Sequence, residues 1–308
     1  MSLGIVTSKI RRANGSSPTT IDGLPVVARK GKIYYFDGSK GGNGNGTSWG
    51  DAANTMASIF AKLVGGETIF VAGKVAEQLV TPVQIFDVSI IGIGNRPRHA
   101  DSTPSGGNTY ASQWAGGGLV AAQANVRVLQ QGWKFENILF SMVDSNAAGI
   151  EICRDAGAGN AERDASHTHV VGCKFAGAGV GIRGGVAGVF TEIPNHCVID
   201  DNVFIDNTHA IRAAIQCQRW SIKRNEFQAN TNHIVAALGS SFIYENIFGS
   251  FTTDSIELPG GQGLNVVTKN YLSGTYSSAG GYTVANANDE WAGNFNGLAG
   301  GITVSDPA

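Results

Sequence analysis

Four short segments of this chain repeat one pattern of residues at a nearly constant spacing. Each begins with an aliphatic residue, has a charged residue third and Asn fourth, and ends two residues later with a large apolar side chain. The segments are Ile199–Phe204, Ile222–Phe227, Ile243–Phe248 and Val267–Leu272, so their first residues are 23, 21 and 24 positions apart. A period of this length is typical of solenoids, in which each repeat is one coil that buries its apolar face only against its neighbours.

A second set of aliphatic residues follows the first at the same period. The residue two positions beyond each of them is apolar or small, as alternation into a narrow core requires. Strand-forming residues fill the coil, Gly, Asn and Ser separate them, and no helical stretch interrupts it. The sequence therefore predicts an all-β parallel β-helix. The second set is Ile150, Ile182, Ile211, Ile234 and Ile256.

The repeated asparagines have a structural interpretation. Asn at a tight turn tolerates left-handed backbone angles, and its amide can bond the equivalent amide of the next coil. We therefore expect a structural ladder. Two looser copies precede the clean four, Phe135–Leu139 with Asn137 and Val171–Phe175 with Cys173 in the Asn place. The predicted ladder is Asn202, Asn225, Asn246 and Asn270.

Composition agrees with a β-solenoid and excludes several classes of protein. Gly accounts for 43 of 308 residues, and only 15% of residues are charged. A net charge of −2 without a Lys/Arg run gives no basis for nucleic-acid binding. The four cysteines lack metal-site spacing and are expected to be buried apolar side chains, so no metal or cofactor is predicted. No apolar run is long enough to span a bilayer, and the N-terminus lacks the pattern of a secretory signal.

Three regions are predicted along the chain. Residues 1–30 form a polar arm suited to docking a partner. Residues 31–66 comprise a strand, a Gly-rich loop and an amphipathic capping helix with Asp51 as its N-cap. Residues 67–308 form the β-helix, from which residues 94–118 stand off as a long loop.

Two segments resemble known proteins. Lys32-Ile-Tyr-Tyr-Phe36, the following Gly-rich loop and Gly66-Glu-Thr-Ile-Phe-Val71 resemble the opening of the pectate-lyase-like right-handed parallel β-helix superfamily, with Glu67 where Asp is usual. Val88–Asp101 is similar to a segment of bacteriophage virion β-helix proteins, including tailspikes. The resemblance implies the fold, and it leaves the activity open because the same fold serves lyases, hydrolases and inert spikes.

Carboxylates are the first candidates for chemistry, because a glycoside hydrolase needs two of them on one face. Asp206, Asp254 and Glu257 are the catalytic candidates, although no cluster of them stands out. Further outward acids are Asp200, Asp201, Glu226 and Glu245. The column Asp201, Arg224, Glu245 and Lys269 alternates in sign, which favours a series of surface ion pairs.

A second column of charges follows the buried isoleucines. It reads Glu151, Arg183, Arg212, Val235 and Glu257. An acid beside two arginines can bind an acidic sugar, so Glu151, Arg183 and Arg212 are predicted ligand-binding residues, with Trp114 as a surface on which a sugar ring stacks. His209 and His233 precede Ile211 and Ile234 and are expected at similar places on one face.

Two functions remain open. The first is a bacteriophage virion protein of spike, fibre or decoration type, a homotrimer located in the virion and produced in the host cytoplasm. Its partners would be other virion proteins, bound through residues 1–30, and a host surface glycan. The alternative is a polysaccharide lyase or glycoside hydrolase that acts on such a glycan. The absence of a signal pattern, the arm and the virion-like segment favour the first.

Overall fold

The computed structural model describes residues 20–21, 24–25, 31–94, 112–116, 123–153, 164–185, 194–259, 263–272, 282–283, 288–298 and 301–304. The chain divides into two units, Met1–Lys30 and Gly31–Ala308. In the first unit, β1 (Thr20–Ile21) pairs antiparallel with β2 (Leu24–Pro25). The predicted boundaries of the arm, capping region and β-helix stay predictions.

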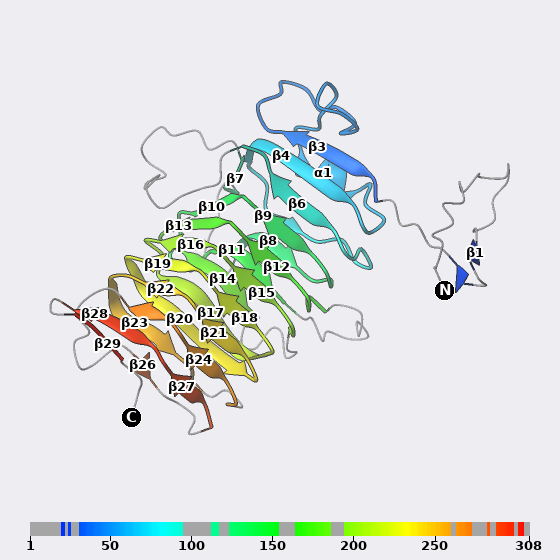
Figure 1. The fold of residues 1–308 in the computed structure, drawn as a ribbon. Coiled ribbons are helices and arrows are strands. Elements are labelled where there is room, and N and C mark those ends of the chain that lie inside the picture. The colour runs from blue at the N-terminus through cyan, green and yellow to red at the C-terminus, as the bar shows by residue number, and fades with distance from the viewer. Residues whose placement is uncertain are drawn as a thin grey trace, which may run out of the picture. The chain divides into compact units, whose positions relative to one another are not determined.

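The second unit is a parallel β-helix, as the sequence predicts. Each coil contributes one strand to each of three faces, and equivalent strands of successive coils pair in parallel (Figure 1). The first face contains β3 (Ile33–Asp37), β4 (Thr68–Val75), β6 (Ser89–Gly92), β9 (Lys134–Glu136), β12 (His169–Val171), β15 (Val198–Asp200), β18 (Ser221–Lys223), β21 (Phe242–Tyr244), β24 (Val266–Thr268) and β27 (Glu290–Ala292).

The second face is continuous with the first, because β4 pairs with β6 on one and with β7 on the other. At its C-terminal end β28 and β29 pair antiparallel. This face contains β7 (Ser112–Trp114), β10 (Leu139–Met142), β13 (Lys174–Gly177), β16 (Val203–Ile205), β19 (Glu226–Gln228), β22 (Ile247–Phe248), β25 (Tyr271–Leu272), β28 (Phe295–Leu298) and β29 (Gly301–Val304).

The third face is a separate eight-stranded sheet. The predicted isoleucine column lies here in unbroken register, from Ile150 through Ile182, Ile211 and Ile234 to Ile256, and all five side chains are buried. The face contains β5 (Leu79–Val80), β8 (Ala124–Val128), β11 (Ala148–Ile152), β14 (Val180–Gly184), β17 (His209–Gln218), β20 (Asn230–Gly239), β23 (Phe251–Glu257) and β26 (Tyr282–Thr283).

A column of stacked rings runs through the core behind the second face. Consecutive rings lie 4.8–5.0 Å apart and within 13° of parallel, close to the spacing between adjacent coils. Four of these rings end sequence repeats, whereas Phe140 lies one residue beyond Leu139, where the first loose copy was expected to end. The same period therefore sets both the hydrogen bonding and the packing. The column is Phe140, Phe175, Phe204, Phe227 and Phe248.

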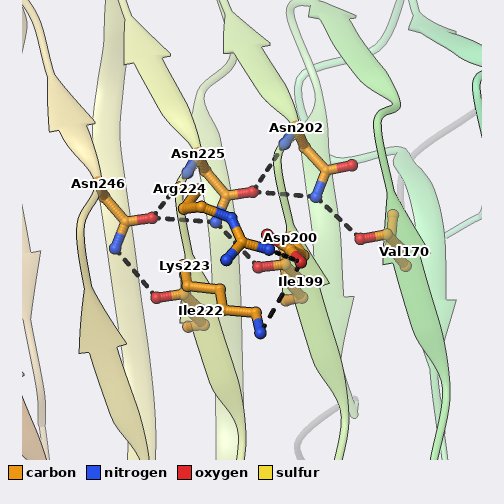
Figure 2. Close-up of polar contacts among 9 residues, drawn as sticks. All are labelled: Val170, Ile199, Asp200, Asn202, Ile222, Lys223, Arg224, Asn225 and Asn246. Carbon is orange, nitrogen blue, oxygen red and sulfur yellow. Dashed lines mark hydrogen bonds and ion pairs between the residues drawn. The ribbon is translucent and has the colours of Figure 1, made fainter.

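The asparagines form a ladder at the corner between the first and second faces (Figure 2). Asn225 Nδ2 donates to Asn246 Oδ1 at 3.0 Å and to the carbonyl of Ile199, and its Oδ1 accepts both the backbone and the side-chain N–H of Asn202. Asn270 and Asn294 continue the ladder. Each buried amide therefore bonds the coils on both sides of it.

The left-handed backbone occurs one residue earlier than the sequence suggests. Asp201, Arg224, Glu245 and Lys269 have φ of 58°, 53°, 57° and 55°, whereas the ladder asparagines do not have positive φ. In the looser copy Asn137 (φ 58°) occupies this left-handed place, and Ile138 lies in the ladder column. The asparagine that follows bonds the neighbouring coil through its side-chain amide. This bonding stabilises a positive-φ conformation that residues other than glycine rarely adopt.

The capping helix is shorter than predicted. α1 spans Met56–Phe60, with Met56, Ile59 and Phe60 buried, and its N-cap is Thr55 rather than Asp51. Thr55 makes no side-chain cap; instead the carboxylate of Glu77 accepts the backbone N–H groups of Met56 and of Ala57. A residue from the following coil thus replaces the local cap.

Candidate functional site

A cluster of charged side chains, some of them buried in ion pairs, lies on the outer side of the third face. Glu151, Arg183 and Arg212 occupy equivalent positions of β11, β14 and β17, each next to an inward isoleucine. Alternation along a strand turns them outward. The register of the predicted column is therefore observed, and Val235 and Glu257 continue it on β20 and β23.

Glu151 is the centre of a buried ion-pair cluster. Arg127 Nε donates to its Oε1 at 2.7 Å, and Arg183 Nη1 donates to its Oε2 at 3.1 Å. The Glu151 side chain is 0% exposed and that of Arg183 is 11% exposed. The Cys153 thiol also donates to Glu151, at 3.1 Å, and burial raises the pKa of that thiol well above its usual value. Because its oxygens are fully engaged, Glu151 fixes the arginines and is not a free ligand or base.

Arg127 belongs to this site although sequence reasoning missed it. It pairs in register with Glu151 from the preceding coil, on β8. The signal was present, because Val126-Arg127-Val128 repeats the aliphatic, charged, aliphatic order of Ile150-Glu151-Ile152. Arg127 and Glu151 are 24 residues apart, which matches the spacing of the clean repeats, so a count of one period back from Glu151 would have found Arg127.

Arg212 differs from the other two arginines of the column. Its side chain is exposed, and within the described residues it has no ion pair or hydrogen bond. His209, three residues earlier, is half-buried, and burial together with the charges of Arg212 and Arg183 lowers its pKa to about 4. The imidazole is therefore neutral at pH 7, and the local potential is positive.

Two of the predicted site residues are placed differently from expectation. Trp114 is fully buried, stacks on Phe140 with ring centroids 5.9 Å apart, and donates its indole N–H to the carbonyl of Glu77. It therefore supports the core and offers no surface to a ligand. His233 does not share the place of His209; it is buried between Phe227 and Phe248, where burial lowers its pKa to about 4.

Asp206 and Glu257, the two carboxylate candidates whose side chains are described, are not brought together. Asp206 is exposed at a left-handed corner between the second and third faces (φ 57°), whereas Glu257 is half-buried on β23, two coils further along. Asp254 also belongs to β23, opposite Asn232, but its side chain lies outside the described residues. Asp206 and Glu257 therefore form no pair suited to glycoside hydrolysis, and the role of Asp254 stays a prediction.

The corner charges pair in a way that differs from the predicted alternation. Asp200 is the acceptor: Lys223 lies 3.8 Å from it, and Arg224 forms a closer ion pair with the same oxygen (Figure 2). Arg224 lies at the left-handed corner just beyond β18, and from there its side chain extends back to Asp200 on β15 of the preceding coil. Asp200 is 13% exposed and Arg224 is 50% exposed, so the pair is only partly shielded from solvent.

Other classes of site are absent from the described part of the chain. It contains no group of three or more His, Cys, Asp or Glu side chains able to hold a metal ion. The four cysteines are free and buried, as expected. No helix among the described residues is both long and apolar enough to cross a membrane.

Comparison with known proteins gives similar solved structures, three of which follow, and no family. No family model and no curated protein matches the chain. YbhC of Escherichia coli is 12% identical over 94% of this chain and 82% of its own, with a TM-score of 0.48. Rice weevil pectin methyl esterase is 12% identical over 91% and 86% (TM-score 0.44). DFA-IIIase of Arthrobacter chlorophenolicus A6, in complex with GF2, is 15% identical over 85% and 69% (TM-score 0.42). At such identities no residue role transfers from them.

Proposed function

We propose that the protein recognises an acidic polysaccharide along the outer surface of its third face. The observation that supports this most directly is Arg212, an exposed guanidinium with no partner among the described residues, in register beside Arg183. A guanidinium binds carboxylate or sulfate through two parallel hydrogen bonds, which a lysine cannot reproduce.

The charges of this column favour an anionic ligand. Glu151 forms ion pairs with Arg127 and Arg183, and the next position of the column adds the positive charge of Arg212. Successive positions lie about 4.8 Å apart along the solenoid. A polymer with acidic groups along its length can therefore contact the face at more than one place, and the cationic surface raises its local concentration.

Recognition of such a glycan fits both functions expected from the sequence. It suits the polysaccharide-degrading alternative, in which the arginines would hold and neutralise a uronic carboxylate, as a lyase requires. It suits the virion receptor-binding role equally, and that role stays a prediction. Because Glu151 is engaged by two arginines, we favour recognition or lyase chemistry over a two-carboxylate hydrolysis at this face.

The test measures the affinity of the protein for polygalacturonate and for neutral dextran at low and moderate salt. A parallel assay for unsaturated uronic products detects lyase activity. We expect polygalacturonate to bind in a salt-dependent manner and Arg212→Gln to weaken binding about tenfold, the loss of one charge-assisted contact. Arg212→Lys should restore binding in part, and Arg219→Gln, at an exposed corner away from the column, is the control. Equal binding of dextran, or unchanged binding by Arg212→Gln, would contradict the proposal.

A further inference from the structure

A second candidate site lies at the corner between the first and second faces, away from the arginine column. It is a cleft of about 340 Å³, near the lower end of the size range of small-ligand sites. Its lining is Ile91, Gly92, Gly94, Glu136, Asn137, Val171, Gly172 and Asp201.

The cleft exists because one side chain is missing from the left-handed corner column. Asn137, Gly172 and Asp201 occupy this corner on three successive coils, with φ of 58°, 62° and 58°. Asn137 and Asp201 extend side chains from it, whereas Gly172 has none. The glycine therefore leaves a gap between two polar side chains.

Hydrogen-bond acceptors dominate this gap. Asn137 Nδ2 donates to the carbonyls of Gly92 (2.8 Å) and Gly94 (3.2 Å), so the amide orientation is fixed. Its Oδ1 is buried and lacks a hydrogen-bond partner in the described structure. Glu136, which pairs with Lys134 at 2.7 Å, and Asp201 add carboxylate oxygens. A buried acceptor without a donor is unfavourable, and a ligand hydroxyl can supply that donor.

The rest of the lining suits the carbon skeleton of a small polyol. Ile91 and Val171 provide apolar contact beside the acceptors. The described lining adds the carboxylates of Asp201 and of Glu136, the latter paired with Lys134, and no positive side chain, so the ligand class differs from that proposed for the arginine column.

We propose that this cleft binds one uncharged or amino sugar unit, whose hydroxyl or ammonium groups donate to Asn137, Asp201 and Glu136. The site is independent of the acidic-glycan face. An occupant with a negative charge is disfavoured, and an occupant larger than a short oligosaccharide is too large for the cleft.

Saturation-transfer NMR and titration with methyl galactoside, glucosamine and galacturonate test this proposal. The most informative variant is Gly172→Asn, which fills the gap with the residue that the same column already tolerates at position 137. We expect Gly172→Asn and Asp201→Asn each to weaken binding of the uncharged or amino sugar at least tenfold. Arg212→Gln should leave it unchanged, and thermal unfolding should show that both cleft variants remain folded.

Several outcomes would overturn the proposal. These are no binding of either sugar by the unmodified protein, tighter binding of galacturonate than of the other two, or wild-type binding by folded Gly172→Asn. Because Arg212→Gln affects the other face alone, failure of this proposal and failure of the acidic-glycan proposal give different patterns across the variants.

Discussion

At the scale of single residues, asparagine links neighbouring coils. Each ladder amide donates to a backbone carbonyl of the preceding coil and to the side-chain oxygen of the next asparagine. None of these side chains is more than 1% exposed. A second, shorter ladder joins Asn207 to Asn230 at the next corner. Buried amides of this kind are stabilising only while every group has a partner.

Asn225→Leu tests the ladder. The substitution removes donors to Ile199 and Asn246 and leaves the Asn202 amide without its acceptor. We expect a loss of unfolding free energy on the order of 2–4 kcal/mol, from broken bonds and unsatisfied buried groups. Chemical denaturation measures it, with Ser221→Ala on the outer side of the same coil as control. An unchanged stability would show that the ladder contributes nothing.

At the scale of elements, the beginning of the solenoid is closed by a short helix held by acids from the coils. Glu77 accepts the first N–H groups of α1, and Glu67, 1% exposed, accepts the N–H groups of Val64 and Gly65 just beyond it. Phe60 packs against Trp133, with ring centroids 5.5 Å apart. A five-residue helix is not stable alone, so it depends on these contacts.

Phe60→Asp should therefore expose the end of the core. We expect a loss of about 3 kcal/mol or more, since an aromatic ring is removed and a charge is placed among apolar side chains. The exposed end should also promote association, which light scattering detects. Ala61→Asp, on the exposed side next to the helix, is the matched control. Wild-type size and stability of Phe60→Asp would rule out a capping role.

At the scale of the whole molecule, the solenoid has its own continuous core. One cluster of buried apolar residues extends from Tyr34 to Leu272 within the second unit. In a linear array of coils each coil is stabilised mainly by its neighbours. Folding of Gly31–Ala308 should therefore be independent of Met1–Lys30.

Deletion of residues 1–30 tests this independence. We expect the truncated protein to keep its β-sheet circular dichroism and an unchanged thermal midpoint, because each coil of the second unit is stabilised mainly by its neighbouring coils. Sedimentation of the full and truncated chains also tests the predicted homotrimer. Loss of the cooperative transition on truncation would show that the arm is part of the fold.

The sequence by itself determined the coil period, the parallel register and the ladder, because each depends on a side chain that recurs at the same place in every coil. Val126-Arg127-Val128, 24 residues before Ile150-Glu151-Ile152, and the Asn207/Asn230 pair, 23 residues apart, contained the same kind of signal. Only the tertiary structure decided where single side chains point and what they meet. Trp114 is buried, and Glu151 is locked between two arginines. The cleft opens at Gly172 because its neighbours, 35 residues before and 29 after it, are brought to one corner. These outcomes depend on contacts between coils whose connecting segments vary in length, and a repeat period contains no information about such segments.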